Sequence, residues 1–280
     1  MYTAGAHHTI YMNEQQIAAA HSPGHLPLLL IAGPGSGKTR VLTHRVSYLL
    51  RRSQAHGVLC LSFSRASCQT FQERIKAVLT PQEIARVRVC TFHSLCLRLC
   101  RENPSLLGLS GTQPFRLVST TEQVQIAKAC LEKHLKEHTS SSNSSSSSSS
   151  NSSSSSSSHN SASNDAYTPS SLVARVDRAK AELRSPEDYS TEDPLFQKLF
   201  RSFVRTMHAD NALSFLDCVV KALSLLRCHP MILNSLQKQY THLLCDEFQD
   251  TSRLQFNLLS LVGGHGRVSL FLLRVLLGSS

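Results

Sequence analysis

A glycine-rich stretch at residues 32–39, AGPGSGKT, constrains the fold of this chain more than any other part of its sequence. It follows a short apolar run at 28–31 and precedes an amphipathic run at 40–50. Taken as strand, loop and helix, these segments match the pattern G-x-x-x-x-G-K-[ST], in which glycines let successive backbone N–H groups face one phosphate chain. The start of the helix adds the positive end of its dipole. The sequence therefore predicts a phosphate-binding loop in an α/β domain.

Residue types inside this stretch have separate chemical roles. Lys38 is expected to reach the β- and γ-phosphates of a nucleotide, and the hydroxyl of Thr39 is expected to ligate Mg²⁺. A glycine-rich turn that carries Lys-Thr by chance is the alternative, and the flanking strand and helix patterns weigh against it. The predicted nucleotide-binding residues of the loop are Ala32, Gly33, Pro34, Gly35, Ser36, Gly37, Lys38 and Thr39.

The charge of the chain suggests a polyanionic partner. Lys and Arg number 29 and Asp and Glu 19 among 280 residues, so the formal net charge is +10. Such a balance favours nucleic acid, although basic proteins without such a partner are common. The nine cysteines include no C-x-x-C pair, which favours buried, reduced thiols over a disulfide framework or a metal site. No secretory signal and no apolar run of about eighteen residues is visible, so we expect no membrane partner.

Strand and helix patterns alternate along much of the chain. Strands are predicted at 28–32, 58–62, 87–91, 240–245 and 268–272. Amphipathic helices follow most of them, and this alternation predicts an α/β fold with a parallel sheet.

The middle of the chain has a different character. Residues 99–211 have mainly helical patterns and are predicted to be a subdomain inserted between 1–98 and 212–280. Within this insertion the serine-rich tract, residues 139–163, cannot bury apolar surface and is predicted to be a disordered linker.

An acidic pair, Asp246 and Glu247, directly follows the predicted strand 240–245. The carboxyl ends of parallel strands are where nucleotide enzymes place such groups. Asp246 is expected to hold Mg²⁺ directly or through water, and Glu247 to orient and activate the attacking water. A solvated acidic turn is the alternative, and the phosphate-binding loop elsewhere in the chain favours the catalytic interpretation.

Together these motifs resemble those of superfamily 1 DNA helicases of the UvrD/Rep/PcrA type, over nearly the whole chain outside the serine-rich tract. AGPGSGKTR at 32–40 and CDEFQDT at 245–251 closely match the family's nucleotide-binding and acidic motifs. Four further segments resemble other motifs of the family: MNEQQ at 12–16, LSFSRASCQTFQERI at 61–75, TFHS at 91–94 and ALSFLD at 212–217.

The resemblance implies a RecA-like P-loop NTPase domain with an inserted helical subdomain, and ATP and Mg²⁺ as cofactors. It also implies ATP-driven 3′-to-5′ movement on single-stranded DNA or a 3′-tailed duplex, with unwinding in repair or recombination. Gln16 would read adenine, and Arg40 would lie near the base. DNA would contact Phe63, Arg65, Phe92 and His93, by stacking on Phe and by charge neutralisation at Arg. Core packing of Phe63 and Phe92, and a helix-start role for His93, are alternatives.

Two departures from the family pattern shape the functional expectation. Arg65, Ser67 and Thr70 stand where the family has Asn, Ala and Glu. After the predicted strand 268–272 the chain reads LRVLLGSS, where the family has a G-D-x-x-Q-S-I-Y-type motif. The resemblance therefore implies a helicase truncated before the second RecA-like domain, which carries the arginine fingers that complete the ATP site. We expect weak ATP binding and hydrolysis near background, because loss of an arginine finger alone costs roughly 10³ to 10⁵ in rate.

The sequence leaves other interpretations of the function open. A non-catalytic module that binds ATP and single-stranded DNA is the alternative to a helicase core. An unrelated P-loop kinase or GTPase fits the acidic and glutamine motifs poorly. A nuclear location is predicted from the implied DNA substrate and the serine-rich tract.

Overall fold

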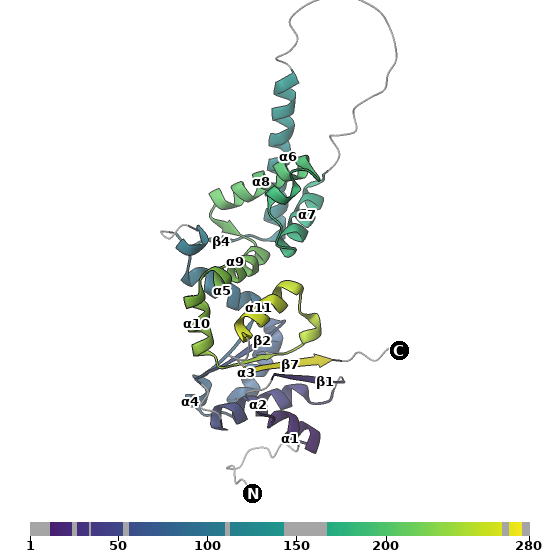
Figure 1. Cartoon of the computed structure of the whole chain (residues 1–280). Coiled ribbons are helices and arrows are strands. Elements are labelled where there is room, and N and C mark those ends of the chain that lie inside the picture. Colours follow the sequence, from purple (N-terminus) through teal and green to yellow (C-terminus); the bar gives the residue numbers. More distant parts are fainter. Residues whose placement is uncertain are drawn as a thin grey trace, which may run out of the picture. The chain divides into compact units, whose positions relative to one another are not determined.

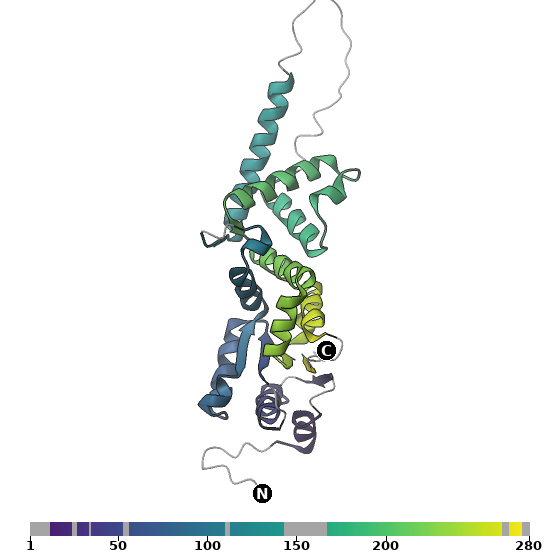
Figure 2. The same ribbon diagram turned by 60° about the vertical axis from the view of Figure 1, so that its left-hand side comes forward.

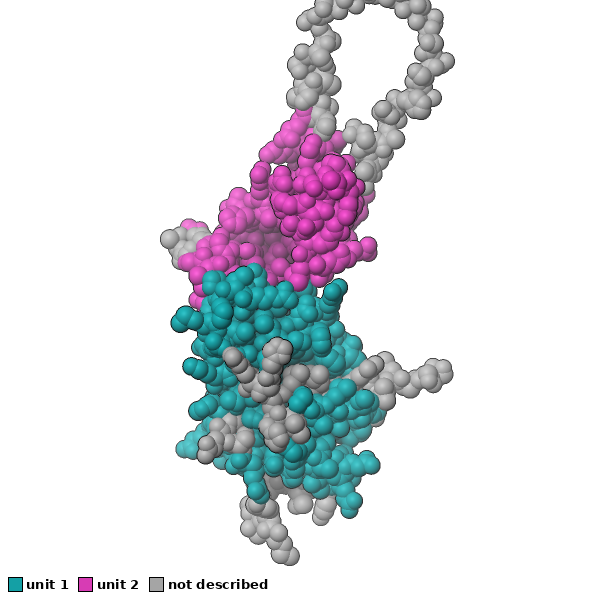
Figure 3. Space-filling view, in the orientation of Figure 1, with its two compact units in different colours: residues 1–95, 223–280 teal, residues 96–222 magenta. Residues whose placement is uncertain are grey.

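The computed structural model describes residues 12–23, 27–33, 35–52, 56–109, 113–142, 167–264 and 269–275. The chain divides into two compact units, which Figure 3 distinguishes by colour. Unit 1 comprises Met1–Leu95 and Leu223–Ser280, and unit 2 comprises Cys96–Ala222. Among the described residues, no helix combines the length and the apolar character needed to cross a membrane.

Unit 1 is built on a five-stranded sheet in the order β1-β7-β6-β2-β3. Every neighbouring pair is parallel, as the alternation of strands and helices predicts. Parallel strands are buried on both faces, and β2, with the sequence VLCLS, is buried along its whole length. The strands are β1 (Leu28–Ala32), β2 (Val58–Ser62), β3 (Val87–Thr91), β6 (His242–Cys245) and β7 (Ser269–Val275).

Helices cover both faces of this sheet. Figures 1 and 2 show α1 (Glu14–Ala20) and α2 (Lys38–Arg52) on one side, and α10 (Pro230–Gln239) and α11 (Arg253–Gly263) on the other. The apolar stripe predicted for the helix after the phosphate-binding loop is buried in the core of unit 1, and its members are Val41, Leu42, Val46, Leu49 and Leu50. The remaining helices of unit 1 are α3 (Arg65–Lys76), α4 (Pro81–Ile84) and the 3₁₀ turn η3 (Phe248–Asp250).

Unit 2 is mainly helical. Its core contains an aromatic cluster in which Phe196 meets Tyr189 edge-on at 4.8 Å and stacks with Phe200 at 5.5 Å between ring centroids. A short parallel pair, β4 (Arg116–Leu117) with β5 (Ala212–Leu213), completes the unit. Its other elements are α6 (Thr120–Ser142), α7 (Pro169–Ala181), α8 (Pro194–Ala209), η1 (Ser105–Leu107) and η2 (Pro186–Tyr189).

The ends of the predicted insertion differ from those of unit 2. Unit 2 spans 96–222 rather than 99–211. The reason is that α5 (Phe92–Glu102) and α9 (Phe215–Cys228) are continuous helices, and each contributes residues to both units. A boundary inside a helix leaves no change of composition for a sequence pattern to detect.

The serine-rich tract begins as helix. The prediction of a disordered linker from residue 139 is wrong for residues 139–142, because α6 continues to Ser142. Once a helix is nucleated, each added residue needs only to fix its own dihedrals for one more hydrogen bond, so serine can extend it. The rest of the tract, 143–163, lies outside the described residues.

A buried ion pair lies in unit 2. Lys180 Nζ on α7 lies 2.6 Å from Asp217 Oδ1 on α9, and these side chains are only 10% and 14% exposed. Burial alone would raise the pKa of Asp217, but the charge and hydrogen bond of Lys180, together with hydrogen bonds from the N–H and hydroxyl of Ser214, outweigh it, so the net pKa is lowered. Asp177, whose pKa is raised by burial, also lies within the field of Lys180. The charge of the lysine therefore acts on two carboxylates, and it forms an ion pair with Asp217.

We expect Lys180→Met to destabilise unit 2 by about 3 kcal/mol at pH 7, because it leaves buried carboxylates without their cation. Lys128→Met is the matched control, since Lys128 lies 3.9 Å from Glu132 with side chains 69% and 55% exposed. Its effect should stay below about 0.5 kcal/mol. Urea unfolding followed by circular dichroism measures both changes in a chain without tryptophan.

The pH dependence of the same pair gives a second check. Because the folded pKa of Asp217 is lowered, its contribution to stability is present above its ordinary pKa and is lost as the pH falls through the folded pKa. The difference between wild type and Lys180→Met should therefore shrink in acid. Equal effects of the two lysine substitutions at pH 7 would contradict a buried pair.

Candidate functional site

The phosphate-binding loop joins β1 to α2 at the carboxyl edge of the sheet. Gly35 and Gly37 have φ values of 71° and 81°, in the left-handed region that glycine adopts without strain. Lys38 begins α2, and its Nζ donates to the carbonyl oxygen of Gly33 at 2.8 Å. Pro34 lies outside the described residues. The backbone thus has the turn that the glycine spacing predicts.

Helix α1 is attached to this loop by one side chain. Gln16 Nε2 donates to the carbonyl oxygen of Ser36 at 2.8 Å, and Gln16 Oε1 accepts from the N–H of Asn13 at 3.1 Å. Asn13 and Gln16 form a capping box at the start of α1. The approach is close, because a Cβ at Gly37 would lie 2.9 Å from Gln16 Nε2. Glycine is favoured here by its dihedrals, and a larger residue would displace the Gln16 amide from the loop.

The acidic pair follows β6 at the same edge. The N–H of Asp246 donates to the carbonyl oxygen of Leu61 at 2.9 Å, which continues the β6–β2 ladder by one residue. Glu247 then has a φ of 52°, an uncommon conformation for a residue with a side chain. Its carboxylate accepts from Gln249 Nε2 at 2.6 Å. The chain therefore turns sharply directly after the strand, and the two carboxylates lie at its end.

A pocket of about 630 Å³ brings the loop together with Glu247 of the acidic pair. Its lining residues are Gly35, Gly37, Lys38, Thr39, Arg40, Thr43, His44, Arg74, Ala77, Val78 and Glu247. Asp246 lies nearby: burial and then the charge of Glu247 raise its pKa, while Lys38 and Arg74 act in the opposite direction. The field of Lys38 therefore reaches the carboxylate that follows β6.

Five lining residues have no role predicted from the sequence, and two of them, Arg74 and His44, are basic. Arg74 belongs to the motif segment 61–75, and His44 lies one helical turn beyond Arg40. Burial, followed by the charges of His21 and Arg40, lowers the pKa of His44, so it is neutral at pH 7. A basic residue at the last turn of a helix is the only sequence signal for Arg74. That Arg74 faces the pocket depends on how α3 packs.

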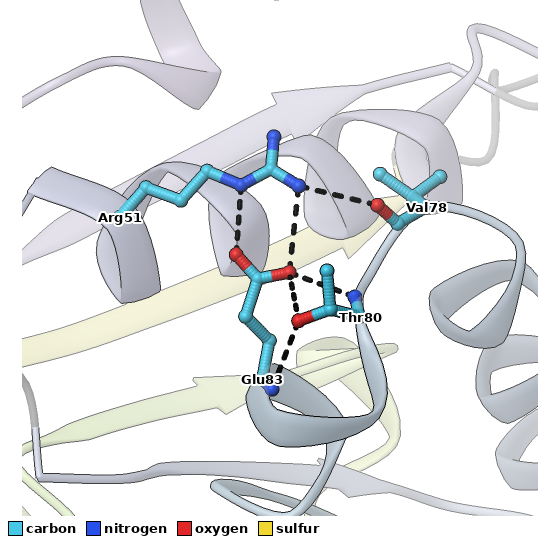
Figure 4. Close-up of polar contacts among 4 residues, drawn as sticks. All are labelled: Arg51, Val78, Thr80 and Glu83. Atoms are coloured by element: carbon cyan, nitrogen blue, oxygen red, sulfur yellow. Dashed lines mark hydrogen bonds and ion pairs between the residues drawn. The ribbon is translucent and has the colours of Figure 1, made fainter. Parts of the chain in front are cut away.

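A polar cluster holds one wall of the pocket in place (Figure 4). Arg51 on α2 donates through Nε to Glu83 Oε1 at 2.8 Å and through Nη2 to the carbonyl oxygen of Val78 at 3.3 Å. The hydrogen bond from Arg51 lowers the pKa of Glu83 to about 2. Glu83 also forms the capping box of α4 with Thr80. The segment that contributes Val78 to the pocket is therefore fixed to the helix that begins with Lys38.

The predicted DNA contacts divide by exposure. Phe63 and Arg65 follow β2 and are exposed, with 57% of Phe63 accessible. His93 is exposed after β3, the neighbouring strand. Phe92 is only 2% exposed and packs in the core, so its ring face is not available to a base. For Phe92 the structure therefore agrees with core packing and not with stacking on DNA.

The donor set fits magnesium held largely by phosphate and water. Thr39 offers a hydroxyl and Asp246 a carboxylate, which matches the few protein ligands that Mg²⁺ takes beside substrate phosphates. Within the described ranges, no group of three or more His, Cys, Asp or Glu side chains could hold a metal ion. The nine cysteines are free thiols, and all except Cys228 are buried.

We expect Asp246→Asn to raise the melting temperature of the nucleotide-free protein at pH 7. Because the folded pKa of Asp246 is raised, ionising it costs stability as the pH rises through that pKa, and asparagine removes this cost. The gain, about 1 kcal/mol, should vanish as the pH falls toward the ordinary pKa of aspartate. Thermal unfolding by circular dichroism across pH 4–8 measures it.

Asp250→Asn is the matched control, because Asp250 is an exposed aspartate near the same turn. It should leave the melting temperature unchanged. A lower melting temperature for Asp246→Asn at pH 7 would show that Asp246 forms stabilising contacts that outweigh its burial.

The comparisons with known proteins agree with this geometry. Residues 12–273 match the UvrD/REP helicase N-terminal domain family. The chain is 27% identical over 251 residues to the ATP-dependent DNA helicase PcrA of Bacillus subtilis. This aligned stretch is 87% of this chain and 30% of that protein. It is 26% identical over 259 residues to PcrA of Staphylococcus aureus, and this aligned stretch is 90% of this chain and 31% of that protein.

The chain thus spans about 30% of the length of the relatives it matches. These relatives are bacterial proteins, and they give no support to the predicted nuclear location. The match covers the phosphate-binding loop, the acidic pair and both units, and the fold that it implies is RecA-like. The chain belongs to the UvrD/REP helicase N-terminal domain family.

Proposed function

We propose that this chain is the ATP-binding N-terminal region of a DNA helicase, and that it couples ATP hydrolysis to 3′-to-5′ movement along single-stranded DNA. The observation that carries the proposal is the shared pocket, in which Lys38 and Thr39 of the loop line the same cavity as Glu247. Helicase family membership supports ATP and DNA as ligands, and the names of the PcrA relatives support unwinding. Repair or recombination is the process to which such unwinding belongs.

Four residues in and beside the pocket have separate roles in phosphoryl transfer. Lys38 exchanges the Gly33 carbonyl for a phosphate oxygen and neutralises charge on the β- and γ-phosphates. Thr39 and Asp246 hold Mg²⁺, which supplies further charge neutralisation when bound. Glu247 orients the attacking water and accepts its proton.

The base of the nucleotide is read by Gln16. A glutamine amide has two donor hydrogens and two acceptor lone pairs. The contacts to Ser36 and Asn13 use one of each, so one donor and one acceptor remain. That pair is complementary to adenine N7 and N6. Arg40, which lines the same pocket, lies beside the base.

One observation favours a second candidate, a non-catalytic module that binds ATP and single-stranded DNA. The hydrogen bond from Gln249 at 2.6 Å occupies a carboxylate oxygen of Glu247. If this bond persists with nucleotide bound, Glu247 accepts a proton less readily, and binding occurs without turnover.

We expect Lys38→Ala to weaken ATP binding about 10-fold to 100-fold, because a charge-assisted contact to phosphate is removed. Glu247→Gln should retain binding and remove the hydrolysis that wild type shows above background, because the group that accepts the proton of water is lost. A fluorescent ATP analogue measures binding, and phosphate release with single-stranded DNA measures turnover. Binding that is lost in Lys38→Ala, without turnover in wild type, would select the non-catalytic module. Undiminished binding by Lys38→Ala would overturn both.

For DNA, we expect Phe63→Ala to weaken single-strand binding roughly 5-fold to 100-fold, the range for loss of one stacked base. Leu29→Ala is the control, because Leu29 is also an exposed apolar side chain, 47% accessible. It lies on β1, the edge strand that is separated from β2 by β7 and β6. Fluorescence anisotropy with a labelled oligothymidine measures both affinities. Equal losses in the two variants would contradict a stacking role for Phe63.

A further inference from the structure

Arg45 is a fully buried cation in the middle of α2, with only 1% of its surface exposed. Burial lowers its pKa, which reflects the cost of removing a guanidinium from water. The group nevertheless stays charged, because the pKa of arginine is far above neutral. A buried charge is retained only where hydrogen bonds compensate it, so its partners show what it does.

The partners of Arg45 are backbone carbonyls at the end of α1. Nη1 donates to the carbonyl oxygens of Ala20 and Ser22, and Nη2 donates to that of Pro23 at 3.2 Å. Ala20 is the last residue of α1, where helical carbonyls have no partner within the helix. The cation also lies at the negative end of the helix dipole. Arg45 therefore terminates α1 and fastens it to α2.

Two rings support the same junction. The Arg45 guanidinium lies 5.7 Å from the centroid of Tyr48, and Tyr48 stacks with His21 at 4.9 Å. Burial first, and then the charge of Arg45, lower the pKa of His242 to about 4, so His242 is neutral beside the buried cation. Arg45 thus supplies a positive charge to the junction, and the geometry of its contacts matches a planar guanidinium better than an ammonium.

The opposite end of α1 carries Gln16. Its amide is hydrogen-bonded to Ser36 in the phosphate-binding loop, and Gly37 leaves just enough room for it. Helix α1 is only seven residues long, so a tilt at its end moves its start. The helix is therefore held against α2 by Arg45 at one end and against the loop by Gln16 at the other.

We propose that Arg45 is a positioning residue for the nucleotide base: by fixing the end of α1 it holds Gln16 against the phosphate-binding loop, and so determines selectivity for adenine. The inference rests on the proposed function, since it requires that the pocket binds a nucleoside triphosphate. Arg45 acts through α1, because Nη1 and Nη2 donate to the carbonyls of α1 and of the turn after it.

The experiment compares ATP with inorganic tripolyphosphate, which lacks the base. Wild type, Gln16→Ala and Arg45→Lys are titrated with each ligand by isothermal calorimetry. We expect both variants to lose ATP affinity about tenfold, as for loss of a bidentate contact to adenine, and to bind tripolyphosphate as wild type does. The double variant should lose no more than either single variant, because both act through one contact.

A second variant tests the same junction in case Arg45→Lys does not fold. His21→Ala removes the exposed ring that stacks on Tyr48 and leaves the buried cation in place. It should lose ATP affinity selectively, though by a smaller factor than Arg45→Lys. Circular dichroism confirms that each variant is folded.

The remaining outcomes separate this inference from the proposed function. If wild type prefers ATP to tripolyphosphate and both Arg45→Lys and His21→Ala keep that preference, the positioning role is overturned and the proposed function stands. If Arg45→Lys lowers the affinities for ATP and for tripolyphosphate by the same factor, Arg45 has a purely structural role and the inference is also overturned. If wild type binds neither ligand, the proposed function fails, and the inference fails with it.

Discussion

The candidate site depends on one constraint, which is that all five strands of the sheet in unit 1 run in the same direction. Parallel strands end at one edge, so the loop after β1 and the acidic turn after β6 meet there although most of the chain separates them. The hydrogen bond from Asp246 to Leu61 continues the ladder to the last residue before the turn. The loop and the acidic pair are both positioned from that edge.

The same edge concentrates charge at a cost in stability. Asp246 has a raised pKa because it is buried beside Glu247, and the fields of Lys38 and Arg74 only partly offset this. Burying a carboxylate in this way is unfavourable to the free protein and suits a site that gains a divalent cation on binding. Arg45, the buried cation of unit 1, differs from Asp246 because three backbone carbonyls accept hydrogen bonds from its guanidinium, and these bonds fasten α1 to α2.

Some parts of the structure were predictable because their cause is local. The strands predicted at 28–32, 58–62 and 87–91 agree with β1, β2 and β3, since short apolar runs bounded by turn residues are a local signal. The strand predicted at 268–272 is instead Ser269–Val275, because the apolar run continues without a stop signal. The end of α6 was missed for the complementary reason, since serine favours no particular conformation and helix propagation decided it.

The sequence by itself determined the phosphate-binding loop, the acidic pair, and the succession of strands and helices along the chain. Each of these is encoded by neighbouring residues with a specific backbone or chemical requirement. Tertiary structure alone decided which of two similar phenylalanines, Phe63 and Phe92, is exposed, and that Arg74 and His44 line the pocket. It also decided that Arg45 fastens α1. These outcomes depend on how helices pack on the sheet, and packing is set by contacts between residues far apart in the chain.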